Sequence, residues 1–287
     1  MTALLPTAAS SAPAQGDVRK QPIGVFDSGV GGLTVLAALH ERLPHESLLY
    51  LGDMARLPYG NKSPQTIIRY ARQAASVLIS RGIKMLVVAC NTASALALDE
   101  LRRAFHPLPI VGVLEPGATA ACAATRTGRI VVIATEATVR EGAYTRAIQS
   151  LRPGAEILAV PCPLFVALAE EGWHSGAIVE AIAKQYLEPV FSRTSTDVLV
   201  LGCTHFPVLA DTLAKVAGPG IQLVDSAHTT AQAVAEMLVR MDLAAEPRAQ
   251  PASVHFMSTD APERFARVAA RFLPQNLRPY EVELIDL

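Results

Sequence analysis

Short apolar runs alternate with longer amphipathic segments along most of this chain. Such runs predict strands buried on both faces, as in a parallel sheet, and the segments between them predict the covering helices. The runs indicate strands at 23–26, 47–51, 85–89, 110–113, 130–134, 156–160, 198–202, 253–257 and 281–285, and a short one ending at 226. The amphipathic segments indicate a helix from 33 and others near 64–81, 91–105, 135–151, 164–171, 175–191, 226–241 and 261–272.

The elements form two similar series. Asp27 ends the opening strand of the first series and precedes Cys90 by 63 residues (90 − 27), and Thr135 ends that of the second and precedes Cys203 by 68 (203 − 135). This near-repeat predicts an α/β fold with two pseudo-symmetric lobes, each a mostly parallel sheet with helices on both faces. The active site is then expected in the cleft between them. The predicted divisions are 1–21, a disordered N-terminal extension; 22–114 plus 225–287, the first lobe; and 115–224, the second.

Composition excludes several classes of protein. The 287 residues are 51% hydrophobic and 18% charged, with a formal net charge of −1. The chain is therefore globular and carries no basic footprint for nucleic acid or for an acidic membrane surface. Arg264, Arg267 and Arg271 share one predicted helix face, which we interpret as solvated. The apolar runs are shorter than a membrane span, and residues 1–21 do not form a signal peptide, so we expect a cytoplasmic protein.

Candidate chemistry centres on two cysteines. Cys90 and Cys203 each follow a predicted buried strand where the chain passes to a helix, which is the edge at which open α/β sheets bind ligands. The positive end of a helix dipole favours a thiolate and can lower the pKa of a cysteine. Two thiols from facing lobes suit removal of an α-proton from one face of a carbon and its return to the other. His205 lies two residues beyond Cys203, and Asp27 ends the strand beside that of Cys90, so each could assist one thiol.

Simpler interpretations apply to the other cysteines and to other chemistries. Cys122 and Cys162 are expected to be small buried apolar residues. A zinc site made by Cys203, His205, Cys90 and Asp27 is an alternative, but no zinc-finger spacing is present and we expect no metal. A redox disulfide between the lobes would require the cleft to close fully.

Motif analysis indicates no cofactor. The glycine-rich segment after the first strand lacks the third glycine of a dinucleotide fingerprint, because position 34 is Thr34. A carboxylate held by Ser28 and nearby backbone N–H groups suits this segment better. No lysine lies in an evident pyridoxal phosphate setting. The turn formed by Pro58, Tyr59 and Gly60 is interpreted either as loop packing or as a wall of the substrate site.

Four segments together resemble the cofactor-independent aspartate/glutamate racemase family, and glutamate racemases in particular. They are Phe26-Asp27-Ser28-Gly29-Val30-Gly31-Gly32, Leu57-Pro58-Tyr59-Gly60, Ala89-Cys90-Asn91-Thr92-Ala93 and Gly202-Cys203-Thr204-His205-Phe206-Pro207. The resemblance runs from about Pro22 to Ala235 with the segments in order. Phe206 stands where the family commonly has tyrosine.

The resemblance implies interconversion of L- and D-glutamate, which supplies D-glutamate for peptidoglycan. It implies that Cys90 takes the α-proton from the D form and Cys203 from the L form, with Asp27 and His205 assisting. Glu170, or Glu171 in its place, matches a further acidic residue of the site. The residues implied to bind substrate are Asp27, Ser28, Pro58, Tyr59, Gly60, Asn91, Thr92, Thr135, Thr138, Thr204 and His205.

Several alternatives stay open at this stage. The nearest is racemisation of aspartate or a hydantoin, since one methylene is worth only about 1–3 kcal/mol of discrimination. A cysteine or zinc hydrolase would need one activated nucleophile, and a two-lobed binding protein would need no thiol pair. Neither a homodimer nor regulation by a peptidoglycan precursor, which some relatives show, can be read from the sequence.

Overall fold

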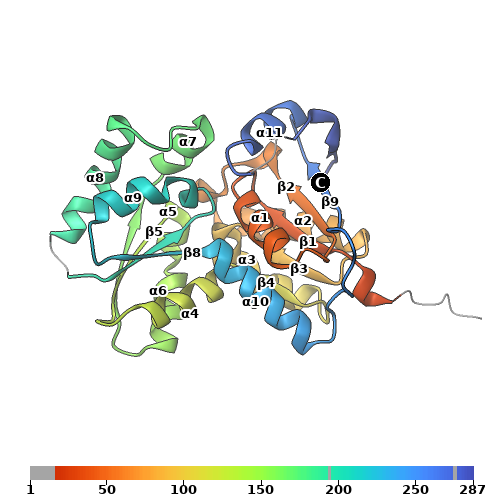
Figure 1. Cartoon of the computed structure of the whole chain (residues 1–287), viewed down its shortest axis with the longest axis horizontal. Helices are drawn as coiled ribbons and strands as arrows, with labels where there is room; N and C mark the ends of the chain where they lie inside the picture. Colours follow the sequence, from red (N-terminus) through yellow and green to blue (C-terminus); the bar gives the residue numbers. More distant parts are fainter. Residues whose placement is uncertain (1–16, 193–194, 274–276) are drawn as a thin grey trace, which may run out of the picture.

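The computed structural model describes residues 17–192, 195–273 and 277–287. The chain forms two lobes that lie side by side, each built on its own parallel sheet (Figure 1). The first sheet has the order β10-β9-β2-β1-β3-β4 and the second the order β6-β5-β7-β8. The first sheet contains β1 (Ile23–Asp27), β2 (Leu48–Gly52), β3 (Met85–Val88), β4 (Ile110–Gly112), β9 (Val254–Ser258) and β10 (Val282–Leu284). The second contains β5 (Arg129–Ala134), β6 (Glu156–Pro161), β7 (Val198–Gly202) and β8 (Gln222–Asp225).

The two sheets share one strand order. Strands β2-β1-β3-β4 of the first correspond to β6-β5-β7-β8 of the second, and every pair of neighbouring strands is parallel. Cys90 follows β3 and Cys203 follows the corresponding strand β7. The predicted pseudo-symmetric α/β fold is therefore confirmed, and its symmetry places the two thiols at corresponding sheet edges.

Helices cover both faces of each sheet. They are α1 (Leu33–Arg42), α2 (Pro64–Ser80), α3 (Asn91–Ala104), α4 (Leu114–Ala124), α5 (Glu136–Glu141), α6 (Ala143–Leu151), α7 (Leu164–Glu171), α8 (Ala177–Phe191), α9 (Ala210–Ala217), α10 (Ser226–Arg240) and α11 (Pro262–Ala269). Shorter 3-10 helices are η1 (Val18–Lys20), η2 (Met54–Arg56), η3 (Tyr59–Asn61), η4 (Phe206–Leu209) and η5 (Pro279–Glu281).

The apolar core consists of four clusters, one on each face of each sheet. Neighbouring residues of a strand enter different clusters, because successive side chains of a strand point to opposite faces. Val87 packs with α1, α10 and α11, whereas Val88 packs with α2 and α3. In the second lobe, Ile133 packs with α7, α8 and α9, whereas Val132 packs with α4 and α6. Burial on both faces explains why these strands are apolar throughout.

Some elements differ from the predicted ones. Helix α4 was not predicted, and the helix expected directly after Cys203 begins only at Ala210, as α9. The single helix expected over 135–151 is divided into α5 and α6 at Gly142. Gly142 has a φ of 67°, a left-handed conformation that ends one helix and that glycine adopts without strain. The expected disordered extension 1–21 is wrong for residues 17–21, which include η1, and residues 1–16 lie outside the described residues.

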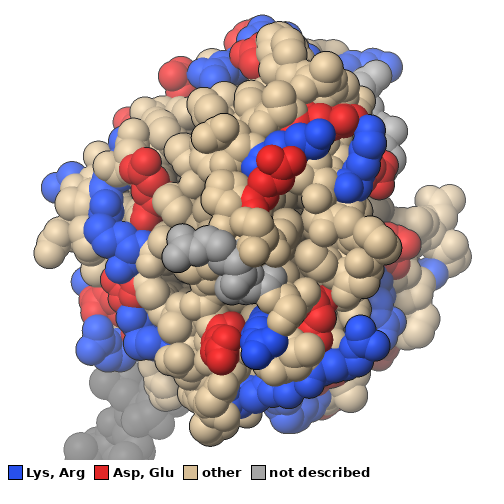
Figure 2. Space-filling view, turned by 90° about the vertical axis from the view of Figure 1, so that its left-hand side faces the viewer, with Lys and Arg blue, Asp and Glu red and all other residues tan. Residues whose placement is uncertain are grey.

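The lobe boundaries at 114/115 and 224/225 stay a prediction. They are supported by the membership of the two sheets, because β8 ends at Asp225 and α10 leads the chain back to the first lobe, packing against α1. In the described part of the chain, no helix has the length and apolar character needed to cross a bilayer. Acidic and basic side chains are interspersed on the face of the second lobe seen in Figure 2.

Candidate active site

A cavity of about 440 Å³ lies between the lobes and is lined by both predicted catalytic thiols. Its size is within the range of small-molecule sites. The lining residues are Ser28, Leu57, Pro58, Tyr59, Gly60, Asn61, Cys90, Asn91, Thr92, Thr135, Glu136, Pro163, Val166, Ala167, Glu170, Cys203, Thr204 and His205. Of the predicted site residues, only Asp27 and Thr138 do not line it.

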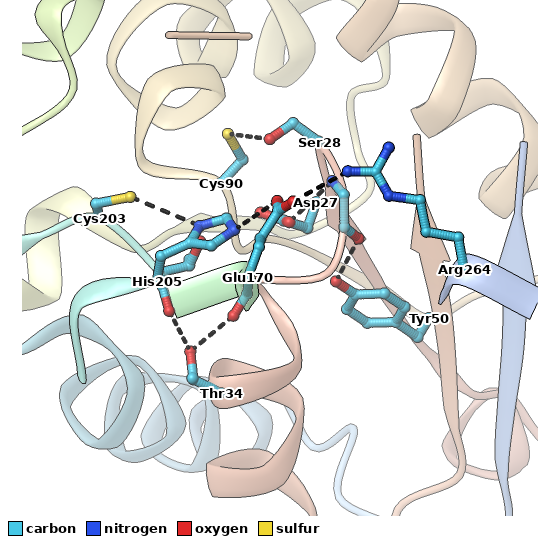
Figure 3. A network of polar contacts seen from close by, with 12 residues as sticks. Asp27, Ser28, Thr34, Tyr50, Cys90, Glu170, Cys203, His205 and Arg264 are labelled. Carbon is cyan, nitrogen blue, oxygen red and sulfur yellow. Dashed lines mark hydrogen bonds and ion pairs between the residues drawn. The ribbon is translucent and has the colours of Figure 1, made fainter. Parts of the chain in front are cut away.

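Cys90 is held at the first turn of α3. Its sulfur is the N-cap of that helix, accepting the N–H of Ala93 at 3.5 Å, and it donates to Ser28 Oγ at 3.3 Å (Figure 3). Burial, together with the nearby negative charge of Asp27, nevertheless raises the pKa of Cys90 to about 12. The helix-start contact with the Ala93 N–H lowers the pKa, as expected, but burial and Asp27 outweigh it. A raised pKa favours the protonated form of Cys90, which is the form that can act as an acid.

Cys203 has a different setting. It is followed by the 3-10 helix η4, so the expected α-helix start is absent at this cysteine. Its sulfur lies 3.8 Å from Nδ1 of His205, and Nε2 of His205 lies 3.2 Å from Oε1 of Glu170. Burial alone would lower the pKa of His205, but its hydrogen bonds to Cys203 and Glu170 outweigh burial and raise the pKa to about 10. An imidazolium thus lies beside the Cys203 sulfur at neutral pH.

The geometry favours Glu170 over Glu171 as the acidic residue of the site. Glu170 lines the cavity and contacts His205, whereas Glu171 is exposed. Burial raises the pKa of Glu170. The hydrogen bond with His205 and the nearby cation of Arg264 lower the pKa by more than burial raises it, so the net pKa lies below the usual value.

Asp27 lies behind the cavity. It is fully buried, and its Oδ2 accepts the N–H of Gly29 at 3.0 Å, while its Oδ1 has no hydrogen-bond partner in the described structure. Burial raises its pKa. An N–H of the glycine-rich loop is therefore used to hold Asp27, whereas we expected these N–H groups to hold a ligand carboxylate. Cys90 contacts Ser28 and has no direct hydrogen bond to Asp27 in the described structure.

The glycine-rich loop allows His205 to approach closely. A Cβ atom at Gly31 would lie 2.4 Å from Nδ1 of His205 and 2.5 Å from Oγ1 of Thr204. No side chain fits in that space, so position 31 must be glycine for His205 to take this position. Thr34, in the following helix, donates to the Thr204 carbonyl at 3.1 Å and so ties the two lobes together at the same point.

Polar groups on the other side of the cavity also join the lobes. The hydroxyls of Thr92, Thr135 and Thr138 form a triangle, with Thr92–Thr135 at 2.9 Å, Thr135–Thr138 at 3.0 Å and Thr92–Thr138 at 3.3 Å. Asn91 Oδ1 accepts from the Tyr144 hydroxyl at 2.7 Å. Thr138 therefore supports Thr92 and Thr135 and does not itself face the cavity.

The turn at Tyr59 forms a wall. The Tyr59 hydroxyl donates to Asp53 at 2.6 Å, so the residue presents its ring to the cavity and directs its hydroxyl elsewhere. This arrangement agrees with the interpretation of the turn as a wall of the substrate site. Gly60 packs against Thr135 of the facing lobe, where an added Cβ would be 2.9 Å from the threonine Cβ.

Some lining residues were missed by the sequence analysis. Leu57 and Asn61 flank the predicted turn, and Glu136 follows Thr135. The other missed residues are Pro163, Val166 and Ala167, which precede Glu170 by seven, four and three residues. These spacings place them on the same side of the α7 segment as Glu170, so a helical projection would have shown them. In the described part of the chain, no three His, Cys, Asp or Glu side chains are arranged to hold a metal ion.

The fold and the site define a two-lobed α/β protein with paired thiols in its cleft. Residues 31–234 match the family described as Asp/Glu/Hydantoin racemase. The glutamate racemase of Geobacter metallireducens is 48% identical over 91% of this chain and 96% of the relative. The chain belongs to this family, among its glutamate racemases.

Solved structures agree with this assignment. The glutamate racemase of Francisella tularensis in complex with D-glutamate is 36% identical, with a TM-score of 0.86 over 93% of this chain and 98% of that one. The Escherichia coli glutamate racemase in complex with L-glutamate and the activator UDP-MurNAc-ala is 30% identical, with a TM-score of 0.73 over 93% of this chain and 98% of that one. The two-sheet fold is thus common to these proteins.

Proposed function

We propose that this chain racemises glutamate by transferring the α-proton between two thiols and so supplies D-glutamate for peptidoglycan. The observation that carries the proposal is that Cys90 and Cys203, from facing lobes, line one cavity of substrate size. A base and an acid on opposite faces of one carbon invert its configuration, and neither needs a cofactor to move a proton.

The reaction proceeds in two proton transfers. The thiolate of Cys203 removes the α-proton of L-glutamate, and the electron pair of the C–H bond passes to the α-carbon and its carboxylate. The protonated thiol of Cys90 then donates its proton to the opposite face, which leaves D-glutamate and a Cys90 thiolate. The reverse reaction exchanges the roles. His205 stabilises the Cys203 thiolate through its positive charge, and Glu170 holds the imidazolium in place.

Cys90 must also act as a base in the D-to-L direction, although burial and Asp27 raise its pKa to about 12. The α-ammonium group of the substrate supplies a positive charge when it binds beside the thiol. An opposite charge within a few ångströms lowers the pKa of a thiol, so binding itself prepares Cys90 for its role as base. Asp27 is buried behind the cavity and is not among its lining residues, so it would act on Cys90 through its charge.

The polar groups of the cavity would orient the substrate. The hydroxyls of Ser28, Thr92, Thr135 and Thr204 and the amide of Asn91 are the candidates for its amino and carboxylate groups. The turn 58–60 would close one side through the Tyr59 ring. Racemisation of aspartate or a hydantoin is the alternative, because the cavity alone discriminates weakly against one methylene.

The proposal is tested by following optical activity. Purified protein without added cofactor should bring either pure enantiomer of glutamate to a racemic mixture, and both Cys90→Ser and Cys203→Ser should lose this activity by about 10³-fold or more. Cys122→Ser is the matched control, since Cys122 lies on α4 outside the cavity, and it should retain activity. Glutamate that keeps its rotation, or faster racemisation of aspartate, would contradict the proposed substrate.

The remaining expectations are also proposals. We infer a cytoplasmic location, where precursors of peptidoglycan are made, and a homodimer, which light scattering would test. Regulation by a peptidoglycan precursor is supported by the E. coli relative bound to UDP-MurNAc-ala. Adding that compound should change the racemisation rate of this protein, and an unchanged rate would exclude such regulation.

A further inference from the structure

Helix α11 of the first lobe and the turn after it reach the second lobe beside the active site (Figures 1 and 3). Arg264 Nη2 donates to Glu170 Oε2 at 3.3 Å. The Arg271 side chain lies over Gly172, within 2.5 Å of where a Cβ would stand at that glycine. The Phe272 ring meets the His205 ring edge-on, with centroids 5.4 Å apart. The arginine-bearing face that the sequence analysis interpreted as solvated is thus partly an interlobe contact.

We propose that Arg264 is a positioning residue for the Cys203 half of the reaction, an inference that rests on the function proposed above. Arg264 holds one oxygen of Glu170, so that the other oxygen faces Nε2 of His205 at 3.2 Å. His205 in turn places Nδ1 at 3.8 Å from the Cys203 sulfur. The charges alternate along this series from guanidinium to carboxylate, imidazolium and thiolate, so each member stabilises the next.

The burial of Glu170 distinguishes this contact from an ordinary surface ion pair. The Glu170 side chain is 17% exposed and lines the cavity, whereas that of Arg264 is 48% exposed at its rim. A carboxylate in this position has few other partners for its second oxygen. Without Arg264, Glu170 gains rotational freedom and loses its alignment on His205.

The contact is also asymmetric between the two thiols. The side-chain partner of Cys90 is the neutral hydroxyl of Ser28, and in the described structure no arginine or lysine forms an ion pair with Asp27 behind it. Removing the charge of Arg264 should therefore slow proton abstraction by Cys203 and leave abstraction by Cys90 unchanged. If Arg264 only stabilised the fold, its removal would slow proton abstraction by both cysteines.

The two half-reactions can be separated with 3-chloroglutamate. A single thiolate removes its α-proton, the electron pair of the C–H bond forms a Cα=Cβ double bond, and chloride leaves with its own bonding pair. The resulting enamine hydrolyses to 2-oxoglutarate and ammonium, so no oxidant and no second thiol are needed. In a Cys90→Ser background, elimination reports on Cys203 with the L enantiomer. In a Cys203→Ser background, it reports on Cys90 with the D enantiomer.

The experiment introduces Arg264→Gln into both backgrounds and measures kcat/KM for chloride release. We expect about a fivefold loss in the Cys90→Ser background, the upper range for a partly exposed ion pair, and no loss in the Cys203→Ser background. Arg264→Lys should restore most of the lost rate. Arg267→Gln, an equal charge change at an exposed position of the same helix, is the control and should alter neither rate.

Equal losses in the two backgrounds, or no loss in either, would overturn the positioning role. Failure of both single-thiol proteins to release chloride while Arg264 is intact would instead refute the two-thiol function, and this proposal with it. Chloride release by Cys90→Ser and Cys203→Ser with Arg264 intact therefore distinguishes failure of the two-thiol function from failure of the positioning role.

Discussion

Nδ1 of His205 lies 3.8 Å from the sulfur of Cys203, on the second lobe, and among the described residues no histidine contacts the sulfur of Cys90 on the first lobe. Cys90 contacts the hydroxyl of Ser28 at 3.3 Å instead. The backbone symmetry of the two lobes is therefore not matched by the electrostatics around the two thiols. One sulfur lies beside an imidazolium, and the other lies beside a neutral hydroxyl and has a raised pKa.

The pH dependence of the reaction should report on His205. Its pKa is raised to about 10, so the ring is charged below that pH and loses its proton above it. We expect kcat/KM to fall as the pH rises through about 10, since kcat/KM reports groups of the free enzyme. In His205→Gln this alkaline limb should disappear and kcat/KM at neutral pH should fall about 10²-fold or more. An unchanged limb in the variant would assign it to another group.

The raised pKa of His205 also makes the free energy of unfolding depend on pH. Because the folded pKa of His205 exceeds the unfolded value of 6.5, its contribution is fully present below pH 6.5 and is lost as the pH rises through about 10. The free energy of unfolding should therefore fall between pH 7 and pH 10 more steeply in the wild type than in His205→Gln. Denaturant titrations at the two pH values measure the difference, and parallel pH dependences would contradict it.

Gly31→Ala should impair catalysis through His205. The added methyl group would lie 2.4 Å from Nδ1 of His205, so the ring must move by about an ångström, a displacement that can cost about 10²-fold in rate. Gly29→Ala in the same loop is the control, because its Cβ would meet the nearest atom at an ordinary 3.5 Å. We expect a loss of kcat/KM in the first variant and a change of about twofold or less in the second. Comparable losses of kcat/KM in the two variants would contradict this explanation, because only the Gly31→Ala methyl group meets His205.

Lys84 is expected to be important for stability. Its buried ammonium contacts Glu46 at 2.5 Å and donates to the carbonyls of Arg19 and Leu243 at 2.7 and 2.8 Å. Lys84→Met leaves the buried Glu46 carboxylate without its cation, and should lower the free energy of unfolding by about 3–5 kcal/mol.

A surface lysine provides the control for this measurement. Lys215 pairs with Glu180 but its side chain is 68% exposed, so Lys215→Met should change the free energy of unfolding by about 0.5 kcal/mol or less. Denaturant unfolding of both variants makes the comparison. A loss below about 1 kcal/mol for Lys84→Met would show that Glu46 finds another partner or takes up a proton at little cost.

Much of the fold could be predicted because its signal is local. Val87 and Val88 belong to a run that is buried on both faces, and Ser63 with Pro64 marks a helix start that the structure reproduces as the N-cap of α2. Helix α4 was missed because its sequence is rich in alanine and has few large apolar residues to set a period. Its helical state depends on packing against other elements, which a local pattern does not contain.

The sequence predicted the site residues that follow strand ends. It did not predict contacts between side chains from distant segments of the chain. Cys90, Cys203 and His205 lie where the strand-end argument places them. The contact of Arg264 with Glu170 joins residues 94 positions apart, and no periodicity of α11 indicates it. The high pKa of Cys90 depends on burial and on Asp27, which opposed the helix-start effect that the sequence suggested.

The transfer of hydrogen in heavy water tests the central claim most directly. A protonated thiol carries a single hydrogen that exchanges with solvent. The thiol that protonates the product therefore delivers deuterium, while the thiolate on the other face takes up the substrate's hydrogen. At low conversion of L-glutamate, the D-glutamate formed should carry one α-deuterium per molecule and the remaining L-glutamate should carry none. D-glutamate that keeps the original α-hydrogen, or deuterium that enters both enantiomers at equal rates, would contradict proton transfer by two thiols on opposite faces.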